Sequence, residues 1–360
     1  MATPKKDTAK LTPAAAPGPM FFRDILGQDR VISHLRTARQ KGRLSHAYLF
    51  LGPEGVGRAS TAQALAAALN CLTPREDGDA CGVCASCRRL AAGTHPDFLI
   101  ISPTSEALKK LQPQIKIEQI REFCRLTSYA PYGDGWRVAL IKPAEAMNEA
   151  AANALLKTLE EPPERHLLAL IARAEADLLP TIVSRCHKLA FTPLPAALVA
   201  RELEGRRGLA PSQAHLLAAL SGGSLGRALN LDPEAILAQR RQVLDDLKAL
   251  AGGSAAVALD WAQRLAKSRP DLDNFLSLAQ LWYRDLLLCH FQAPASLLAH
   301  QDLQTDLNRA AAATPPETWF NKFTALGTAQ RHLQANLNPE LTLDILGLRL
   351  QRRGQPHGSR

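Results

Sequence analysis

LFLGPEGVGRAST, residues 49–61, follows a short apolar segment and precedes an alanine-rich one. This order predicts a strand over residues 47–51, a glycine turn, and a helix over residues 61–69. Gly52 and Gly57 stand at the spacing of the phosphate-binding pattern G-x-x-x-x-G-K-[ST], in which backbone N–H groups surround phosphate oxygens. The stretch therefore has the shape of a phosphate-binding loop.

The chemistry of that loop is incomplete. The position that needs a Lys holds Arg58, and the position that needs a Ser or Thr holds Ala59. A planar guanidinium is not equivalent to a compact ammonium, and a methyl group cannot coordinate Mg²⁺. One interpretation is an inherited phosphate loop, made by Gly52, Gly55, Gly57 and Arg58, whose catalysis has decayed and whose nucleotide binding is left open. The other is a glycine turn that binds nothing.

Composition limits the classes of protein that this chain can belong to. Its 360 residues are enough for two or three domains, and abundant Ala and Leu with few aromatic residues favour helices. No run of about 18 apolar residues is present, so we expect no membrane span. A net charge of +9 favours an acidic partner, nucleic acid first. Residues 1–20 are rich in Pro, Ala and Lys and lack the apolar region of a secretory signal, so we expect a disordered leader there. We expect residues 354–360 to be a mobile tail.

Four of the seven cysteines lie close together in the sequence. They are Cys71 and the three cysteines of the run CGVCASC, Cys81, Cys84 and Cys87. Two overlapping C-x-x-C steps and a fourth Cys upstream predict a tetrahedral zinc site with four thiolates, which is structural because it has no open position. A redox pair or unliganded thiols are the alternatives. We expect His95 to pack at the start of a strand rather than to act as a ligand. Nothing indicates secretion, so we expect reduced thiols and a cytoplasmic protein.

Apolar segments alternate with helical ones through the first half of the chain. Further strands are expected at residues 98–101, 136–141 and 167–172, and a short helix then leads through Arg185 into another strand. Helices are expected at residues 28–42, 115–130 and 144–161. This alternation predicts an α/β domain with a parallel sheet wrapped by helices. After residue 191 the pattern is almost entirely helical, with breaks near residues 193 and 251.

The strand at residues 136–141 ends in Lys142 and Pro143. In an ATPase of this architecture the strand would end in Asp-Glu, the pair that orients Mg²⁺ and the attacking water. A cation and an imide do neither task. Glu145 lies two places out of register, so we do not expect it to replace the missing carboxylate.

Three elements together resemble the bacterial clamp-loader subunits of the AAA+ class. They are the CGVCASC module, NALLKTLEEPPE at residues 153–164, and SRC at residues 184–186. This resemblance implies an AAA+ (RecA-like) domain at residues 21–192 with an inserted zinc module at 71–87. It also implies an all-α lid at 193–250 and an all-α collar at 251–353.

Four departures from active clamp-loader ATPases point to a member of the ring that does not hydrolyse ATP. The loop lacks its Lys and Ser/Thr, and the acidic pair is replaced by Lys142 and Pro143. The segment IARAEAD has no clear polar sensor, and Arg227 lies one residue after the place of the phosphate-sensing Arg.

The resemblance further implies that Arg185 of SRC is an arginine finger that projects into the ATP site of a neighbouring subunit, while residues 153–164 are structural. Implied partners are gamma or tau ATPase subunits, a delta subunit, the sliding clamp and primed DNA, in a five-subunit loader of a DNA polymerase III holoenzyme. A set of basic residues is a weaker candidate for DNA phosphates inside the ring: Lys109, Lys110, Lys116, Arg121 and Arg125.

Two alternatives from other classes stay open at this point. One is a gamma-like AAA+ ATPase with an atypical loop, which would hydrolyse ATP without a partner. The other is a zinc-dependent DNA-binding module outside replication, which would bind DNA tightly by itself.

Overall fold

The computed structural model describes residues 21–104, 113–132, 134–335 and 337–351. The leader at 1–20, the tail at 354–360, and Lys109 and Lys110 lie outside the described residues. The chain forms two compact units, the first ending at Pro193 and the second beginning at Leu194. In the described part of the chain, no helix has the length and apolar character needed to cross a membrane.

The first unit is built on one five-stranded sheet with the order β2-β3-β4-β1-β5, in which every neighbouring pair is parallel. The predicted parallel sheet is therefore confirmed. The strands lie within a residue or two of their expected positions because each is a short apolar run bounded by polar or turn residues. Their bounds are β1 Ala47–Leu51, β2 Phe98–Ile101, β3 Arg137–Ile141, β4 His166–Ala172 and β5 His187–Ala190.

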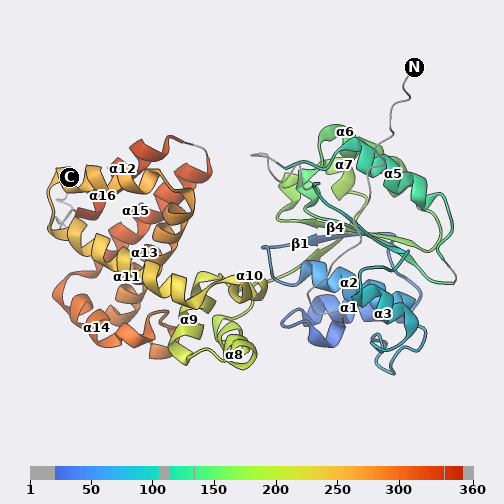
Figure 1. Cartoon of the computed structure of the whole chain (residues 1–360), viewed down its shortest axis with the longest axis horizontal. Coiled ribbons are helices and arrows are strands. Elements are labelled where there is room, and N and C mark those ends of the chain that lie inside the picture. The colour runs from blue at the N-terminus through green and yellow to red at the C-terminus, as the bar shows by residue number, and fades with distance from the viewer. Residues whose placement is uncertain (1–20, 105–112, 133, 336, 352–360) are drawn as a thin grey trace, which may run out of the picture. The chain divides into compact units, whose positions relative to one another are not determined.

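Helices cover both faces of this sheet (Figure 1). On one face lie α1 (Asp29–Gln40), α2 (Arg58–Asn70) and α3 (Ala85–Ala91). On the other lie α5 (Ile117–Thr127), α6 (Glu149–Glu160) and α7 (Pro180–Val183). Short 3-10 turns complete the unit: η1 Phe22–Asp24, η2 Ala144–Ala146 and η3 Glu175–Asp177.

Two apolar cores lie between the sheet and its helices. Alternate residues of β1 enter different cores, since Tyr48 and Phe50 pack toward α1 and α2 while Leu49 packs toward α5 and α6. All three side chains are almost completely buried. A strand buried on both faces reads as a continuous apolar run, which is why the sequence locates it well.

One predicted helix is wrong at its beginning. Residues 144–161 do not form a single helix, because η2 ends at Ala146 and α6 begins only at Glu149. The cause is Asn148, whose side chain accepts a hydrogen bond from the backbone N–H of Ala151 at 2.8 Å and so caps a new helix. The predicted apolar periodicity ran through this cap.

The second unit is helical, as expected. Its helices pack against one another in pairs, with α12 against α16, α13 against α14 and α15, and α8 against α9. The expected border between lid and collar falls near the end of α11. Because α11 contacts α9, α13 and α16 within this one unit, the division into lid and collar stays a prediction. The helices are α8 Ala196–Arg207, α9 Pro211–Leu220, α10 Leu225–Asn230, α11 Pro233–Gly252, α12 Ala255–Ala266, α13 Arg269–His290, α14 Gln304–Ala313, α15 Pro316–Gln334 and α16 Pro339–Gln351, with 3-10 turns η4 Ala295–Leu297 and η5 Gln301–Leu303.

Candidate functional site

The glycine loop leaves β1 at the edge where the carboxyl ends of the central strands meet. Leu51 pairs with Ala172 of β4 and with Ala190 of β5, so the loop begins beside the ends of both neighbours. Gly52 has a φ of +139°, and a Cβ there would lie 2.5 Å from the carbonyl oxygen of Phe191. Only glycine fits this approach, so the first loop glycine is fixed by packing against the chain after β5.

The two later glycines give the loop its curvature. Gly55 has a φ of +76° and Gly57 a φ of +103°, both in the left-handed region. Gly57 is also the N-cap of α2, so the loop runs directly into the helix, as it does in a phosphate-binding loop. The backbone shape expected from the sequence is therefore present.

Arg58, at the position of the phosphate-binding Lys, points into the protein. The residue is 7% exposed, and its Nη1 donates a hydrogen bond to the carbonyl oxygen of Ala172, the last residue of β4. Burial lowers the pKa of Arg58, while the carboxylates of Glu145 and Glu54 act in the opposite direction. The guanidinium is thus occupied by the sheet rather than presented to the loop.

The groups that would hold Mg²⁺ are missing or engaged. Ala59 has no hydroxyl, and the hydroxyl of Thr61 donates to the carbonyl oxygen of Gly57 at 2.8 Å. At the end of β3, burial lowers the pKa of Lys142, which stands where a carboxylate would be needed. Glu145 lies 3.9 Å from Nε of Arg173, and its Oε2 is buried without a partner among the described residues.

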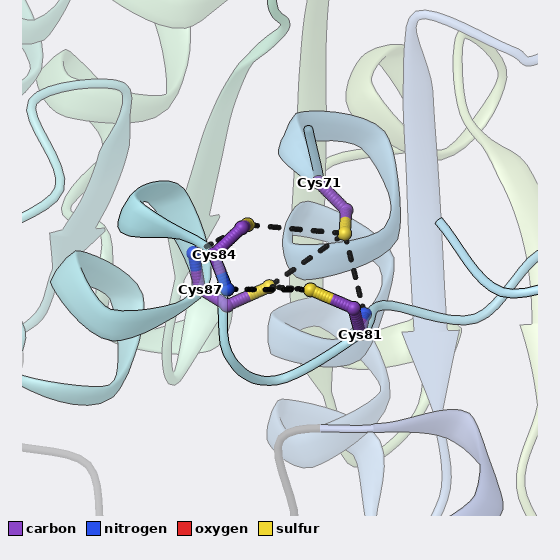
Figure 2. A group of neighbouring side chains, drawn as sticks. All are labelled: Cys71, Cys81, Cys84 and Cys87. Carbon is purple, nitrogen blue, oxygen red and sulfur yellow. Dashed lines mark hydrogen bonds between the residues drawn. The ribbon is translucent and has the colours of Figure 1, made fainter. Parts of the chain in front are cut away.

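The four clustered cysteines converge, as the sequence predicts. Their sulfur atoms all lie within 4.8 Å of one another, with Sγ–Sγ distances of 4.0 Å for Cys71 and Cys84, 3.9 Å for Cys81 and Cys87, and 3.8 Å for Cys71 and Cys87. A tetrahedral zinc with Zn–S bonds of about 2.3 Å would hold its sulfurs about 3.8 Å apart. Figure 2 shows the four side chains directed at a common centre. The cluster can hold a metal ion.

Backbone N–H groups surround these sulfurs. Sγ of Cys81 accepts from the N–H of Val83 at 3.4 Å and from that of Cys84 at 3.3 Å, and Sγ of Cys84 accepts from the N–H of Cys87 at 3.4 Å. A hydrogen bond from the side chain of Thr73, together with these N–H groups, lowers the pKa of Cys81 to about 5. These donors stabilise the thiolate form of Cys81, which is the form that binds metal, whereas burial raises the pKa of Cys71 and of Cys87.

Asp79 attaches the cysteine module to the start of the first unit, and sequence reasoning missed it. Its carboxylate is completely buried and accepts from the N–H groups of Phe22 at 3.2 Å, Arg23 at 3.1 Å and Ala80 at 2.8 Å. The guanidinium of Arg23 lies 3.3 Å away. No local pattern signals this role, because Phe22 and Arg23 lie more than 50 residues from Asp79 in the chain.

His95 is engaged outside the cysteine cluster. Its Nδ1 accepts a hydrogen bond from the N–H of Asp97 at 3.2 Å, and its Nε2 lies 3.1 Å from the hydroxyl of Ser86. Burial lowers its pKa. With both ring nitrogens paired just before β2, His95 packs at the start of the strand, as expected.

Arg185 lies between α7 and β5 with its side chain 35% exposed. Its Nη1 donates to the carbonyl oxygen of Thr181 at 2.9 Å, and its Nη2 donates to Oε1 of Glu160 at 2.7 Å. Glu160 is the last residue of α6 and belongs to the NALLKTLEEPPE segment. The structure therefore brings two of the three family segments into contact, a link that sequence reasoning did not anticipate.

The remaining candidates are exposed. Lys116, Arg121 and Arg125 lie at or on α5, and Arg125 is paired with Glu122 at 2.7 Å. Arg227 is exposed on α10, where its backbone N–H donates to the hydroxyl of Ser224. Nothing in their surroundings distinguishes them from ordinary surface cations.

Known proteins resemble this chain over much of its length. A family model described as "DNA polymerase III, delta subunit" matches residues 27–195. The DNA polymerase III subunit delta′ of Bacillus subtilis is 31% identical over 330 residues, which are 90% of this chain and 96% of that protein.

Other relatives match a shorter part. The DNA polymerase III subunit delta′ of Pseudomonas aeruginosa is 42% identical over 208 residues, which are 57% of this chain and 61% of the relative, so the match spans less than two thirds of that protein. The DNA polymerase III subunit tau of Escherichia coli is 37% identical over 231 residues, 62% of this chain and 34% of the relative.

Proposed function

This chain belongs to the DNA polymerase III delta′ subunit family, and from that membership we propose that it is a clamp-loader subunit that does not hydrolyse ATP. It helps to load the sliding clamp onto primed DNA, and it donates Arg185 to the ATP site of a neighbouring subunit. The parallel sheet, the degenerate loop and the exposed arginine each support one part of this proposal.

The observation that carries the proposal is the placement of Arg58. Nη1 of Arg58 could reach a phosphate in the loop only by giving up its hydrogen bond to the carbonyl oxygen of Ala172. That change would leave a buried carbonyl without its partner, at a cost of about 1–3 kcal/mol. Because Ala59 and Lys142 also remove both metal-binding groups, neither the phosphates nor Mg²⁺ has its usual ligands.

Arg185 has the properties of a residue that acts outside its own chain. It lies at the surface, on the short connection between α7 and β5, and its guanidinium is held in place by two acceptors. In a neighbour's site it would stabilise the charge that develops on the γ-phosphate, a task worth about 10³–10⁵ in rate for arginine fingers in general.

The four-cysteine cluster would hold a structural zinc ion. Four thiolates complete a tetrahedral shell, so the metal would have no open position for a substrate or water. Its chemistry would be to cross-link the segment between α2 and α3, which is too short to bury a core of its own. The residues that would bind it are Cys71, Cys81, Cys84 and Cys87.

The partners that fit this function are gamma or tau ATPase subunits, a delta subunit, the sliding clamp and primed DNA, in a cytoplasmic assembly of five subunits. The similarity to tau over 231 residues supports a common ring-forming domain. Within such a ring this chain would be a non-catalytic subunit of the polymerase holoenzyme.

The same similarity keeps one second function open, that of a gamma- or tau-like ATPase with an atypical loop. Measuring ATP hydrolysis by the purified chain, alone and with a gamma-type partner, clamp and primed DNA, separates the two. We expect no turnover by the chain alone and a higher turnover of the partner when the chain is added. Robust turnover by the chain alone would contradict the proposal.

The Arg58→Lys variant sharpens this experiment. Restoring the ammonium should not produce hydrolysis by the isolated chain, because the hydroxyl at position 59 and the carboxylates after β3 are also absent. Turnover by this single variant would mean that Arg58 alone had silenced an otherwise complete site.

A further inference from the structure

A basic groove lies at the opposite edge of the sheet from the glycine loop. It has a volume of about 260 Å³ and is formed by the C-terminal half of α1, the connection that follows it, and the amino ends of β1 and β5. Because all strands are parallel, the amino ends of β1 and β5 are separated from the loop by the full length of the strands. The groove is therefore distinct from the degenerate nucleotide site.

The polar lining of the groove consists of cations, imidazoles and hydroxyls, and no acidic residue lines it. Lys41 and Arg43 supply two permanent positive charges. The rings of His34 and His187 stack with centroids 4.8 Å apart and an interplanar angle of 8°. Hydroxyl groups complete the lining, from Thr37, Ser45 and Tyr48.

Tyr48 contributes a buried donor to this groove. The residue is 1% exposed, and its phenol oxygen accepts a hydrogen bond from the N–H of Ser45 at 3.0 Å. Within the described part of the chain, its own hydroxyl hydrogen is donated to no residue. A ligand in the groove can accept that hydrogen, and a buried hydroxyl gains from being satisfied.

The two histidines of the groove likewise have no acidic residue beside them in its lining. The pKa of His34 is lowered by burial and, to a smaller extent, by the neighbouring His187. Burial and the neighbouring ring therefore disfavour a positive charge on His34 unless an anion lies close to it. The groove therefore offers cations and donors that its own residues leave without an anionic partner.

We propose that this groove binds a phosphate group. A phosphate oxyanion matches the two permanent cations in charge and can accept hydrogen bonds from a guanidinium, an ammonium and a hydroxyl at once. A metal ion does not fit the same residues, because the lining has two cations and neither a carboxylate nor a thiolate. The phosphate can belong to free phosphate or to the backbone of a nucleic acid.

Isothermal titration calorimetry on the full chain tests the site with inorganic phosphate and, separately, with a single-stranded oligonucleotide that lacks terminal phosphates. The variants are Lys41→Ala and Arg43→Ala, whose exposed side chains can be removed without opening a core. Arg30→Ala is the matched control, since it removes the same charge from an exposed position of α1 that does not line the groove.

We expect each groove variant to raise the dissociation constant of at least one probe about fivefold to tenfold, as the loss of a charge-assisted hydrogen bond predicts. The control should stay within about twofold, the range expected from long-range charge alone. His34→Gln, which keeps a polar side chain, should weaken binding of the same probe.

The two probes separate the sources of the phosphate group. Variant-sensitive binding of inorganic phosphate alone identifies a site for free phosphate, and variant-sensitive binding of the oligonucleotide identifies a backbone site. Absence of binding for both probes overturns the proposal. Equal losses in the groove variants and in Arg30→Ala overturn it as well, because they would reflect only the net charge of the chain.

Discussion

Oε1 of Glu160 lies 2.7 Å from Nη2 of Arg185, and this contact joins the end of α6 to the segment between α7 and β5. Both side chains are partly exposed, at 50% and 35%. Exposed ion pairs of this kind contribute about 0–1 kcal/mol, so the pair can orient the guanidinium and still release it when a stronger anion arrives. The proposed finger is thus held in one direction at little energetic cost.

Replacing Arg185 by Ala tests the proposed finger. We expect the variant to assemble with its partners, because the side chain lies at the surface, while ATP turnover of the reconstituted complex falls at least about tenfold. Lys188→Ala is the control, since it removes a nearby exposed cation that pairs with Glu175. Unchanged turnover in Arg185→Ala, measured in a complex of normal composition, would refute the assignment.

Glu160→Gln tests whether the ion pair positions that arginine. The variant loses the charge of the acceptor but keeps the shape of the side chain, so the protein should fold and assemble normally. We expect turnover of the complex to fall about twofold to fivefold, which corresponds to the small energy of an exposed pair. A rise in turnover would show instead that Glu160 competes with the γ-phosphate for Arg185.

Metal analysis of the purified protein should find about one zinc ion per chain. Cys84→Ser should reduce this content and lower the melting temperature of the first unit, because the metal cross-links the segment between α2 and α3. Cys289→Ser, which changes a cysteine of the second unit, should leave the zinc content unchanged. A folded wild-type protein without metal would contradict the zinc assignment.

Asp79→Ala should destabilise the first unit by about 2–4 kcal/mol. The substitution removes the acceptor of three backbone N–H groups and leaves the guanidinium of Arg23 without its buried partner. Asp77→Ala is the matched control, because the side chain of Asp77 is 43% exposed and its loss should cost less than about 1 kcal/mol. Urea unfolding followed by circular dichroism measures both, and equal losses would mean that Asp79 is not an anchor.

The sheet and the cysteine cluster were predictable because their signals are local. A buried parallel strand such as β4 is a continuous apolar run, and the spacing of Cys81, Cys84 and Cys87 already brings their sulfurs together. The structure confirms the sheet with its strand bounds shifted by a residue or two, and it brings together the four cysteines that the sequence indicated.

The features that escaped prediction depend on contacts between distant residues or on a single cap. Asp79 meets Phe22 across 57 positions, and Glu160 meets Arg185 across 25, distances that no periodic pattern spans. Asn148 interrupts an apolar repeat that continues on both sides of it, so the repeat alone joined η2 to α6. The orientation of the Arg58 side chain could not be predicted for the same reason, because Ala172 comes close to it only in the folded sheet.

Under the proposed function, the hydrogen bond between Arg58 and Ala172 would also make this chain insensitive to the energy status of the cell. If Arg58 stays bonded to the carbonyl oxygen of Ala172, the loop would not alternate between a nucleotide-bound and a nucleotide-free form as the ratio of ATP to ADP changes. Under the proposed function, the subunits beside it change with every cycle, whereas this one keeps a constant shape. Nutrient starvation would then slow the complex through its neighbours and leave this subunit's own contribution the same.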